Sequence, residues 1–123
     1  AQIESWQRRC EFEGMCRAAE VFRNRSPKFS QRALAGTTQA VNAIPELIER
    51  GKTALQIFYQ DLDKQLEGAE FIVGDHFSIV DITAVCVIDF AVLLKVAIPE
   101  ELTNLTQWLE RTHQRPSVAN HFV

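Results

Sequence analysis

Apolar residues recur every three to four positions along most of the chain, and no run alternates apolar and polar residues as strands do. This period predicts a first helix from about Ile3 to about Phe22 and a second, long helix from about Pro45 to Leu66. A third helix is predicted from Ser78 to about Val96, and a fourth around Leu102–Leu109 that ends before Pro116. The sequence therefore predicts an all-α bundle of about five helices in a single domain of 123 residues.

The connections between these helices are less regular. The stretch Asn24–Lys28 breaks the first helix, and residues 29–42 form either a short helix or an ordered loop. Gly51 lies within the long second helix, where glycine costs roughly 1 kcal/mol relative to alanine, so it indicates close packing at that point. Ser117 is predicted to cap a last short turn over residues 118–122.

The first predicted helix carries two apolar stripes, which together are wider than one packing partner needs. One stripe consists of Ile3, Trp6, Cys10, Gly14 and Ala18, and the other of Phe12, Met15, Cys16, Ala19 and Phe22. The second stripe either packs into the core or lines a pocket for an apolar ligand, with the flexible Met15 at its centre. The spacing by itself slightly favours core packing.

Three helix-start signals lie together before the third predicted helix. Ser78 is placed to accept a hydrogen bond from the amide of Asp81, and the Asp81 carboxylate is placed to accept one from the amide of Ser78, as in a capping box. Phe77 and Ile82 occupy the two positions that form a hydrophobic staple. These four residues are therefore expected to fix the start and the direction of this helix rather than to perform chemistry.

Composition and charge exclude several classes of function. The net charge is −3 and the basic residues are scattered, so nucleic-acid binding is not expected. Cys10, Cys16 and Cys86 lack metal-ligand spacing, and their odd number favours reduced thiols in a cytoplasmic protein. The longest apolar stretch, residues 82–97, contains charged residues and is too short for a membrane span. No metal site is expected.

Few residues outside the helix starts suggest chemistry. His76 is expected in a turn, and His113 and His121 lie in exposed patterns near the end of the chain, with no partners for a catalytic triad. Asp89 shares a helical stripe with apolar residues, and a buried carboxylate must be paired, hydrogen-bonded or protonated. A structural partner, such as an arginine or a helix-end amide, is the first interpretation of Asp89, and a functional acid with a raised pKa is the alternative.

The segment Gly74–Ala84, with its Gly-Asp, Phe-Ser and Asp-Ile-Thr elements followed by an apolar helix, resembles the signature of the C-terminal domain of cytosolic glutathione transferases. Three weaker matches follow the order of that family. Trp6–Arg9 resembles the start of the first helix of the domain, Ala43–Lys52 resembles the next long helix of bacterial members, and Trp108–Ser117 resembles the closing helices. Together these matches span nearly the whole chain.

The resemblance implies the helical half of a cytoplasmic, homodimeric detoxification enzyme that conjugates glutathione to small electrophilic apolar substrates. In this family a preceding thioredoxin-like domain binds glutathione, which is a co-substrate rather than a tightly bound cofactor, and supplies the residue that activates its thiol. No catalytic residue is therefore assigned to these 123 residues, which alone are expected to be inactive. The first residue is Ala1 rather than methionine, which also suggests a piece of a longer protein.

The resemblance also implies positions for the site. It places one wall of the electrophile pocket at Phe12, Met15, Cys16 and Ala19. Some bacterial relatives carry a His-Lys pair at the positions of Met15 and Cys16, so this wall is more apolar than theirs. Arg8 corresponds to a position from which related dimers, usually through Asn or Asp, contact the glutathione of the partner subunit. The alternative function is a non-catalytic interaction module, which this fold provides in some translation and scaffold proteins.

Overall fold

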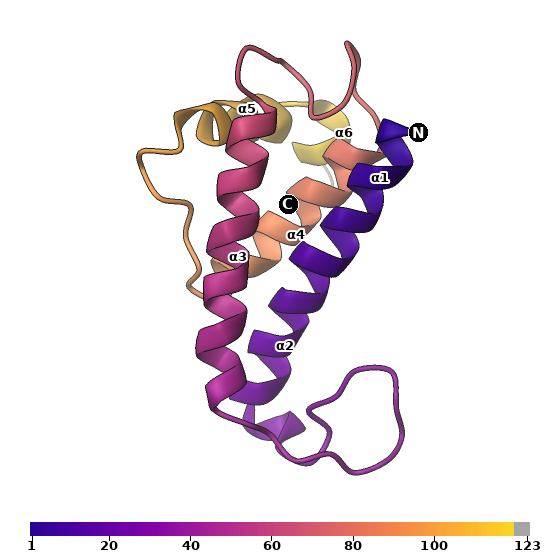
Figure 1. Cartoon of the computed structure of the whole chain (residues 1–123), viewed down its shortest axis with the longest axis vertical. Coiled ribbons are helices and arrows are strands. Elements are labelled where there is room, and N and C mark those ends of the chain that lie inside the picture. The colour runs from indigo at the N-terminus through magenta and orange to yellow at the C-terminus, as the bar shows by residue number, and fades with distance from the viewer. Residues whose placement is uncertain (120–123) are drawn as a thin grey trace.

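The computed structural model describes residues 1–119, and the first of its helices consists of three consecutive segments. These are α1 (Gln2–Arg9), the π-helical segment η1 (Cys10–Met15) and α2 (Cys16–Arg25). The joining residues keep right-handed helical backbone angles, so the helix continues from the N-terminus to the long loop of residues 26–45 at the foot of Figure 1. The helix predicted over Ile3–Phe22 is thus confirmed and extends slightly further, whereas apolar spacing did not predict its π-helical segment.

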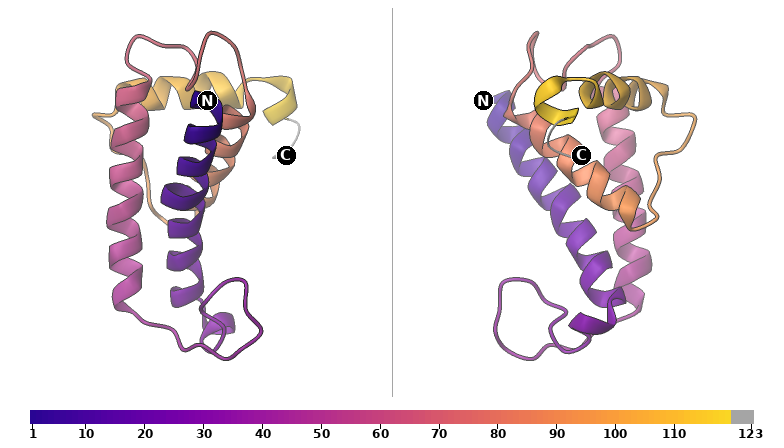
Figure 2. Two further views of the ribbon diagram at one scale, coloured as in Figure 1. Left: turned by 45° about the vertical axis from the view of Figure 1, so that its right-hand side comes forward. Right: turned by 180° about the vertical axis from the view of Figure 1, so that it is seen from behind.

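The helix α3 (Glu46–Gln65) runs antiparallel beside this first helix, as predicted for Pro45–Leu66 (Figures 1 and 2). Gly51 is buried where the two helices meet. A Cβ added to Gly51 would lie 2.7 Å from Val21 Cγ2 and 3.2 Å from the carbonyl oxygen of Arg17. The close packing predicted from Gly51 is therefore confirmed.

The helix α4 (Ile79–Leu93) crosses the first helix and contacts α1 and η1. The buried side of α4 consists of Val80, Asp81, Ala84, Val85, Val87, Ile88 and Ala91. A second side carries the exposed residues Ile79, Ile82 and Leu93. The sequence predicted a helix surrounded by the bundle, but within the described chain one side of α4 remains open to solvent.

The end of α4 comes slightly before the predicted Val96. Lys95 has a φ of 70°, a left-handed conformation that stops the helix, and the amide of Val96 donates a hydrogen bond back to the carbonyl oxygen of Ala91 at 3.0 Å. The carbonyl oxygen of Val96 accepts a hydrogen bond from the buried hydroxyl of Tyr59 at 2.8 Å. Burial raises the pKa of the Tyr59 phenol above its ordinary value, so this hydroxyl stays a donor.

Gly14 allows the first helix to meet two other helices at once. A Cβ added to Gly14 would lie 2.9 Å from Phe58 Cε2 on α3 and 2.9 Å from Val87 Cγ1 on α4. Gly14 belongs to the π-helical segment η1, in which the extra residue per turn changes the direction of the side chains that follow. The backbone of η1 thus lies at the centre of the three-helix contact.

Two shorter helices cover the end of the bundle opposite the long loop (Figure 2). These are α5 (Thr103–His113) and α6 (Pro116–Ala119), so the predicted break before Pro116 is confirmed. Ser117 lies inside α6 rather than before a last turn, and residues 120–122 of the predicted turn lie outside the described residues.

The start of α4 is organised by one buried carboxylate. The amide of Ser78 donates to Asp81 Oδ2 at 3.0 Å in a capping box, while the Ser78 hydroxyl accepts from the amide of Val80 at 3.3 Å. Asp81 Oδ1 accepts two further hydrogen bonds, from the amide of Ile72 at 3.2 Å and from Trp108 Nε1 at 2.9 Å. Asp81 therefore links three parts of the chain: the segment before α4 that contains Ile72, the start of α4 at Ser78, and α5 through Trp108.

Phe77, one of the two residues expected to form the hydrophobic staple, contacts an aromatic ring and an arginine. The ring of Phe77 lies edge-on to Phe71 with 6.5 Å between centroids, and the guanidinium of Arg115 lies 3.8 Å from the centroid of Phe77. Ile82 is exposed, and a clasp between Ile82 and Phe77 is not among the contacts described for residues 1–119, so the staple stays a prediction.

Candidate functional site

The four residues predicted to form the pocket wall lie along one face of the first helix. Phe12 is 62 % exposed and Met15 is 36 % exposed, although both are large apolar side chains. Cys16 is exposed and Ala19 is half-buried one turn further along. Phe22 ends this stripe differently, because it packs against two other phenylalanine rings at the edge of the core. The second stripe of the first helix thus faces solvent from Phe12 to Cys16 and turns towards the core at Phe22.

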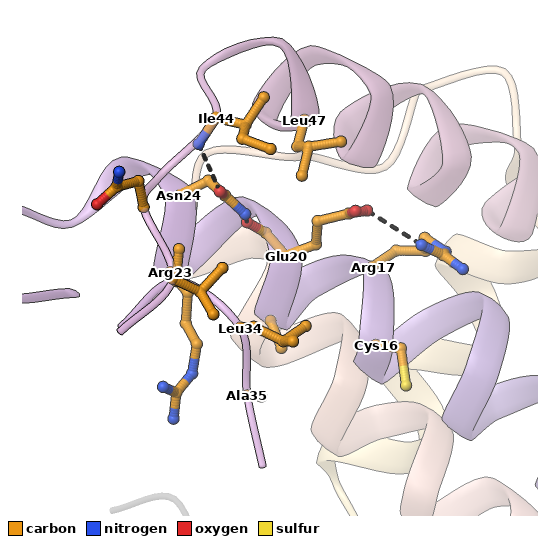
Figure 3. Close-up of a pocket in the computed structure, with 13 residues that line it drawn as sticks. Cys16, Arg17, Glu20, Arg23, Asn24, Leu34, Ala35, Ile44 and Leu47 are labelled. Carbon is orange, nitrogen blue, oxygen red and sulfur yellow. Dashed lines mark hydrogen bonds and ion pairs between the residues drawn. The ribbon is translucent and has the colours of Figure 1, made fainter. Parts of the chain in front are cut away.

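A cavity of about 400 Å³ lies next to this wall, between α2, the long loop and the start of α3 (Figure 3). Its apolar lining includes Ala19, Ala33, Leu34, Ala35, Val41, Ile44 and Leu47. Cys16 and Ala19 belong to both the wall and the cavity, whereas Phe12 and Met15 are not among the residues that line the cavity. The structure therefore brings two of the four predicted wall residues to a cavity, and it adds loop residues that the sequence analysis did not select.

Backbone hydrogen bonds pair the two sides of the loop that lines the cavity. It begins with the short 3-10 helix η2 (Pro27–Phe29), and a single β-bridge pairs Arg32 with Val41. The amide of Ala33 donates to the carbonyl oxygen of Val41 at 3.0 Å, and the amide of Val41 donates to that of Gln31 at 2.9 Å. Of the two alternatives for residues 29–42, the ordered loop is the one observed.

Asn24, near the end of α2, forms a hydrogen bond to the backbone of this loop. Its side chain is buried, donates to the carbonyl oxygen of Glu20 at 2.7 Å and accepts from the amide of Ile44 at 2.9 Å. Arg23 Nη1 donates a second hydrogen bond from α2 to the loop, to the carbonyl oxygen of Arg32 at 3.0 Å. The sequence analysis placed Asn24 only in a helix break, and a single asparagine three residues before Pro27 gave no sign of a buried role.

Two charged residues that line the cavity, Arg17 and Glu20, form an ion pair within the protein. Arg17 lies 3.0 Å from Glu20, and Arg50 on α3 lies 3.5 Å from the same carboxylate (Figure 3 shows the first pair). Asn24, the buried polar side chain of the lining, is occupied as a donor and as an acceptor. The lining of the cavity therefore combines apolar surface with the guanidinium of Arg23, which donates a hydrogen bond to the backbone carbonyl oxygen of Arg32.

Arg8, to which the resemblance assigns a contact with the partner subunit, is exposed on α1. Its guanidinium lies 3.2 Å from Glu11, one turn along the same helix. Exposed pairs of this kind contribute roughly 0–1 kcal/mol and hold a side chain only loosely. Arg8 is therefore accessible, and its contact across a dimer stays a prediction.

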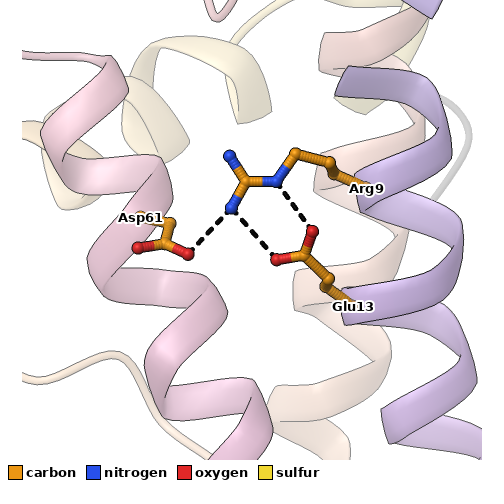
Figure 4. Close-up of polar contacts among 3 residues, drawn as sticks. All are labelled: Arg9, Glu13 and Asp61. Carbon is orange, nitrogen blue, oxygen red and sulfur yellow. Dashed lines mark hydrogen bonds and ion pairs between the residues drawn. The ribbon is translucent and has the colours of Figure 1, made fainter. Parts of the chain in front are cut away.

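The neighbouring Arg9 has a more constrained position that the sequence analysis did not predict (Figure 4). Arg9 Nε and Nη2 donate to the two oxygens of Glu13 at 2.7 and 3.0 Å, and Nη2 also donates to Asp61 on α3 at 2.8 Å. The guanidinium lies 4.2 Å from the centroid of the Trp6 ring. Hydrogen bonding to Glu13 raises the pKa of Arg9, so the guanidinium that joins the first helix to α3 stays protonated.

The three cysteines differ in environment. Cys10 is fully buried, and its burial raises the pKa of the thiol to about 12. Cys86 is half-buried, and burial followed by the nearby charge of Asp89 raises the pKa of its thiol as well. Cys16 is exposed at the edge of the cavity. All three are free thiols in the described chain.

We expect iodoacetamide to modify Cys16 first, Cys86 more slowly and Cys10 last, because the thiolate is the reactive form and access is required. A raised pKa keeps the neutral form, so raising the pH from about 7 to about 9 should leave Cys10 unmodified, with thiolate forming only as the pH approaches about 12. Peptide mass spectrometry after timed labelling measures the order. Labelling of Cys10 as fast as Cys16 would contradict it.

Asp89 and His76, which the sequence analysis considered for a chemical role, each form a hydrogen bond with another side chain. Asp89 is half-buried and accepts or shares a hydrogen bond with His113 Nε2 at 2.8 Å, so its partner is a histidine rather than an arginine or a helix-end amide. His76 lies in an exposed turn, 2.9 Å from Asp75, and this hydrogen bond lowers the pKa of the Asp75 carboxyl. His121 lies outside the described residues. Among residues 1–119, no group of three potential ligands could hold a metal, and no helix is long and apolar enough to span a membrane.

Comparison with known families supports the resemblance over most of the chain. The family model described as "Glutathione S-transferase, C-terminal domain" matches residues 25–116. The chain belongs to this family. A curated relative, glutathione S-transferase 2 of Saccharomyces cerevisiae, is 41 % identical over 56 residues, which make up 46 % of this chain and 24 % of the relative.

Solved glutathione S-transferase structures share the fold of this C-terminal domain. Gtt2 from Saccharomyces cerevisiae has a TM-score of 0.81 at 27 % identity and is matched over 96 % of this chain and 54 % of its own length. A glutathione S-transferase of class Gtt2 from Vibrio parahaemolyticus has a TM-score of 0.76 at 32 % identity, with 96 % of this chain and 51 % of that chain covered. A glutathione S-transferase domain-containing protein from Marinobacter aquaeolei has a TM-score of 0.79 at 29 % identity, with 94 % and 54 % covered. The chain thus spans about half the length of these solved relatives.

Proposed function

We propose that this chain is the helical half of a glutathione transferase that conjugates glutathione to small electrophilic apolar substrates. The observation that carries the proposal is the exposed apolar face of the first helix, where Phe12 is 62 % and Met15 is 36 % exposed. Large apolar side chains gathered on an open face mark a binding surface. With Cys16 and Ala19, they form one wall of the electrophile pocket.

The other wall and the thiol-activating residue would come from a thioredoxin-like domain outside this chain. The exposed side of α4, with Ile79, Ile82 and Leu93, supports the docking of such a domain, because burial of these side chains would favour association. In a cytoplasmic homodimer, Arg8 would lie near the glutathione bound by the partner subunit. The role of the wall is to hold the electrophile close to the glutathione thiolate, so its contribution is position and exclusion of water rather than acid–base chemistry.

Replacing Met15 with tryptophan should change the substrate preference of the full-length enzyme and leave its melting temperature nearly unchanged. The larger ring fits on an open face but narrows the pocket, so kcat/KM for a bulky aryl halide should fall about tenfold relative to a small one. Steady-state kinetics with both substrates measures this ratio.

Ile57→Trp is the matched control, since Ile57 is 52 % exposed on α3 and lines neither the wall nor the cavity. It should alter neither the substrate ratio nor the melting temperature. A large loss of stability in Met15→Trp would instead show that Met15 belongs to the core.

The enzyme is distinguished from a non-catalytic interaction module by two measurements on the full-length protein. A transferase should be retained on immobilised glutathione and should conjugate a model aryl halide. Absence of both retention and turnover would favour the interaction module.

A further inference from the structure

The π-helical segment η1 has two sides with opposite environments. Its inner residues, Cys10 and Gly14, are buried where η1 contacts α3 and α4. Its outer residues, Phe12 and Met15, are exposed and are two of the four residues of the proposed wall. Any rotation of η1 about the helix axis would therefore change the direction in which the wall faces.

The extra residue in the turn of η1 also sets the direction of the wall beyond this segment. The amide of Cys16 donates to the carbonyl oxygen of Glu11, five residues earlier, which is the hydrogen bond of a π-helix. Each residue of an α-helix turns by about 100°, so without the extra residue Cys16 and Ala19 would point about 100° away from their present direction relative to α1. Because an α-helix is the ordinary alternative, contacts with the neighbouring helices must select the π form.

Arg9 and Glu13 hold one side of η1. Arg9 Nε and Nη2 donate to the two carboxylate oxygens of Glu13 at 2.7 and 3.0 Å. A bidentate pair of this kind has a defined geometry as well as a favourable charge interaction. Since Glu13 lies between the exposed Phe12 and the buried Gly14 in the chain, fixing the direction of Glu13 fixes the rotation of η1.

Asp61 connects this pair to α3. Arg9 Nη2 donates to Asp61 Oδ2 at 2.8 Å while the same guanidinium holds Glu13 (Figure 4). The guanidinium also lies 4.2 Å from the centroid of the Trp6 ring, and the three charged side chains are partly buried. The rotation of η1 is thus set relative to α3 and not only within its own helix.

Packing on the inner side of η1 opposes large rotations. A Cβ added to Gly14 would lie 2.9 Å from Phe58 on α3 and 2.9 Å from Val87 on α4, so the backbone of η1 lies close to both side chains. A large rotation would carry the side chain of Glu13 or Met15 into this space, which holds no room for it. The two ion pairs on the α3 side fix the small rotations that remain.

We propose that Arg9, Glu13 and Asp61 are positioning residues for the electrophile wall. They hold η1 in the rotation that presents Phe12 and Met15 to the substrate. The inference rests on the proposed function and deepens it, because it gives residues outside the wall a part in substrate selection. Asp61 acts through Arg9, and Arg9 acts through Glu13.

The test compares Glu13→Ala and Asp61→Ala in the full-length enzyme, with a bulky and a small aryl halide assayed on the same preparation. In each variant kcat/KM for the bulky substrate should rise about threefold relative to the small one, because a loosened wall admits it more easily. The change should come from KM for the electrophile, while KM for glutathione stays at the wild-type value. This ratio does not depend on the folded fraction, so lower stability alone cannot move it.

The two substitutions should also be coupled. Because both residues act through Arg9, the double variant should change the ratio by less than the product of the two single changes. Glu13→Gln, which keeps an acceptor oxygen for Arg9, should change it less than Glu13→Ala. Glu49→Ala is the matched control, since Glu49 also pairs with a cation, Lys52 at 3.4 Å, but within α3 alone. It should leave the ratio and both KM values unchanged.

Amide hydrogen exchange provides a readout that needs no turnover. In full-length Glu13→Ala protein, peptides from residues 10–16 should exchange about threefold faster or more, whereas peptides from α4 should keep the wild-type rate. Wild-type exchange in η1, or an unchanged substrate ratio in folded and active variants, would overturn the proposal. Absence of turnover in the wild type would contradict the proposed function alone, and the exchange rates would then still decide whether these residues hold η1.

Discussion

Replacing Asp81 with alanine is expected to lower the free energy of unfolding by about 4 kcal/mol, a loss large enough to reduce the yield of folded protein. The carboxylate is fully buried and accepts hydrogen bonds from the amides of Ser78 and Ile72 and from Trp108 Nε1. Alanine would leave these donors without an acceptor and would remove the Asp81 half of the capping box, while the Ser78 hydroxyl would still accept from the amide of Val80. Chemical denaturation monitored by tryptophan fluorescence gives the free energy directly.

Asp75→Ala provides the control for this experiment, because Asp75 precedes the same helix but its side chain is exposed and bonded to His76. The free energy of unfolding of this variant should stay close to that of the wild type. In soluble full-length Asp81→Ala protein, turnover per folded molecule should remain near the wild-type value, since Asp81 lies in the core. Unchanged melting together with lost turnover would contradict this structural role.

Gly51→Val is expected to destabilise the protein by about 3 kcal/mol. A Cβ at this position would already lie 2.7 Å from Val21 Cγ2 and 3.2 Å from the carbonyl oxygen of Arg17. Val21 is fully buried and stiff, and a backbone oxygen moves only with its helix, so α2 and α3 would have to separate. The higher helix propensity of a residue other than glycine, worth less than about 1 kcal/mol, cannot offset that separation.

The same denaturation measurement on Thr53→Val tests whether the loss of stability in Gly51→Val comes from the contact between α2 and α3. Thr53 is exposed on α3, so valine there should change the free energy of unfolding by only about 0.5 kcal/mol. Equal losses in the two variants would show that valine disturbs the helix itself and that the contact with Val21 matters little.

The sequence predicted the helices well, because each long helix carries its own periodic apolar face and its own end signals. The start of α4 shows this most clearly: Ser78 and Asp81 have the spacing of a capping box, and the box is present. Gly51 was informative for a similar reason, since a glycine within a strong helical pattern indicates contact at short distance.

The cavity could not be predicted, because it depends on a loop whose path has no period. Asn24 is polar and adjacent to a helix break, yet it is buried by contacts with Glu20 and Ile44, the latter 20 positions further along the chain. The π-helical segment η1 is another such feature, since Gly14 signals close packing but not the extra residue in the turn. The hydrogen bond from Trp108 to Asp81 could not be predicted either, because the two residues lie 27 positions apart and no local pattern links them.

The cavity has a further consequence for how the family can diversify. All of its lining residues fall within one continuous stretch, residues 16–47, whereas the hydrogen bonds of the Asp81 network lie between residues 72 and 108. Insertions, deletions or substitutions near Leu34 can therefore reshape the cavity while the folding core stays intact. The loop is a region in which natural variation or directed evolution can change the lining of the cavity with little loss of stability.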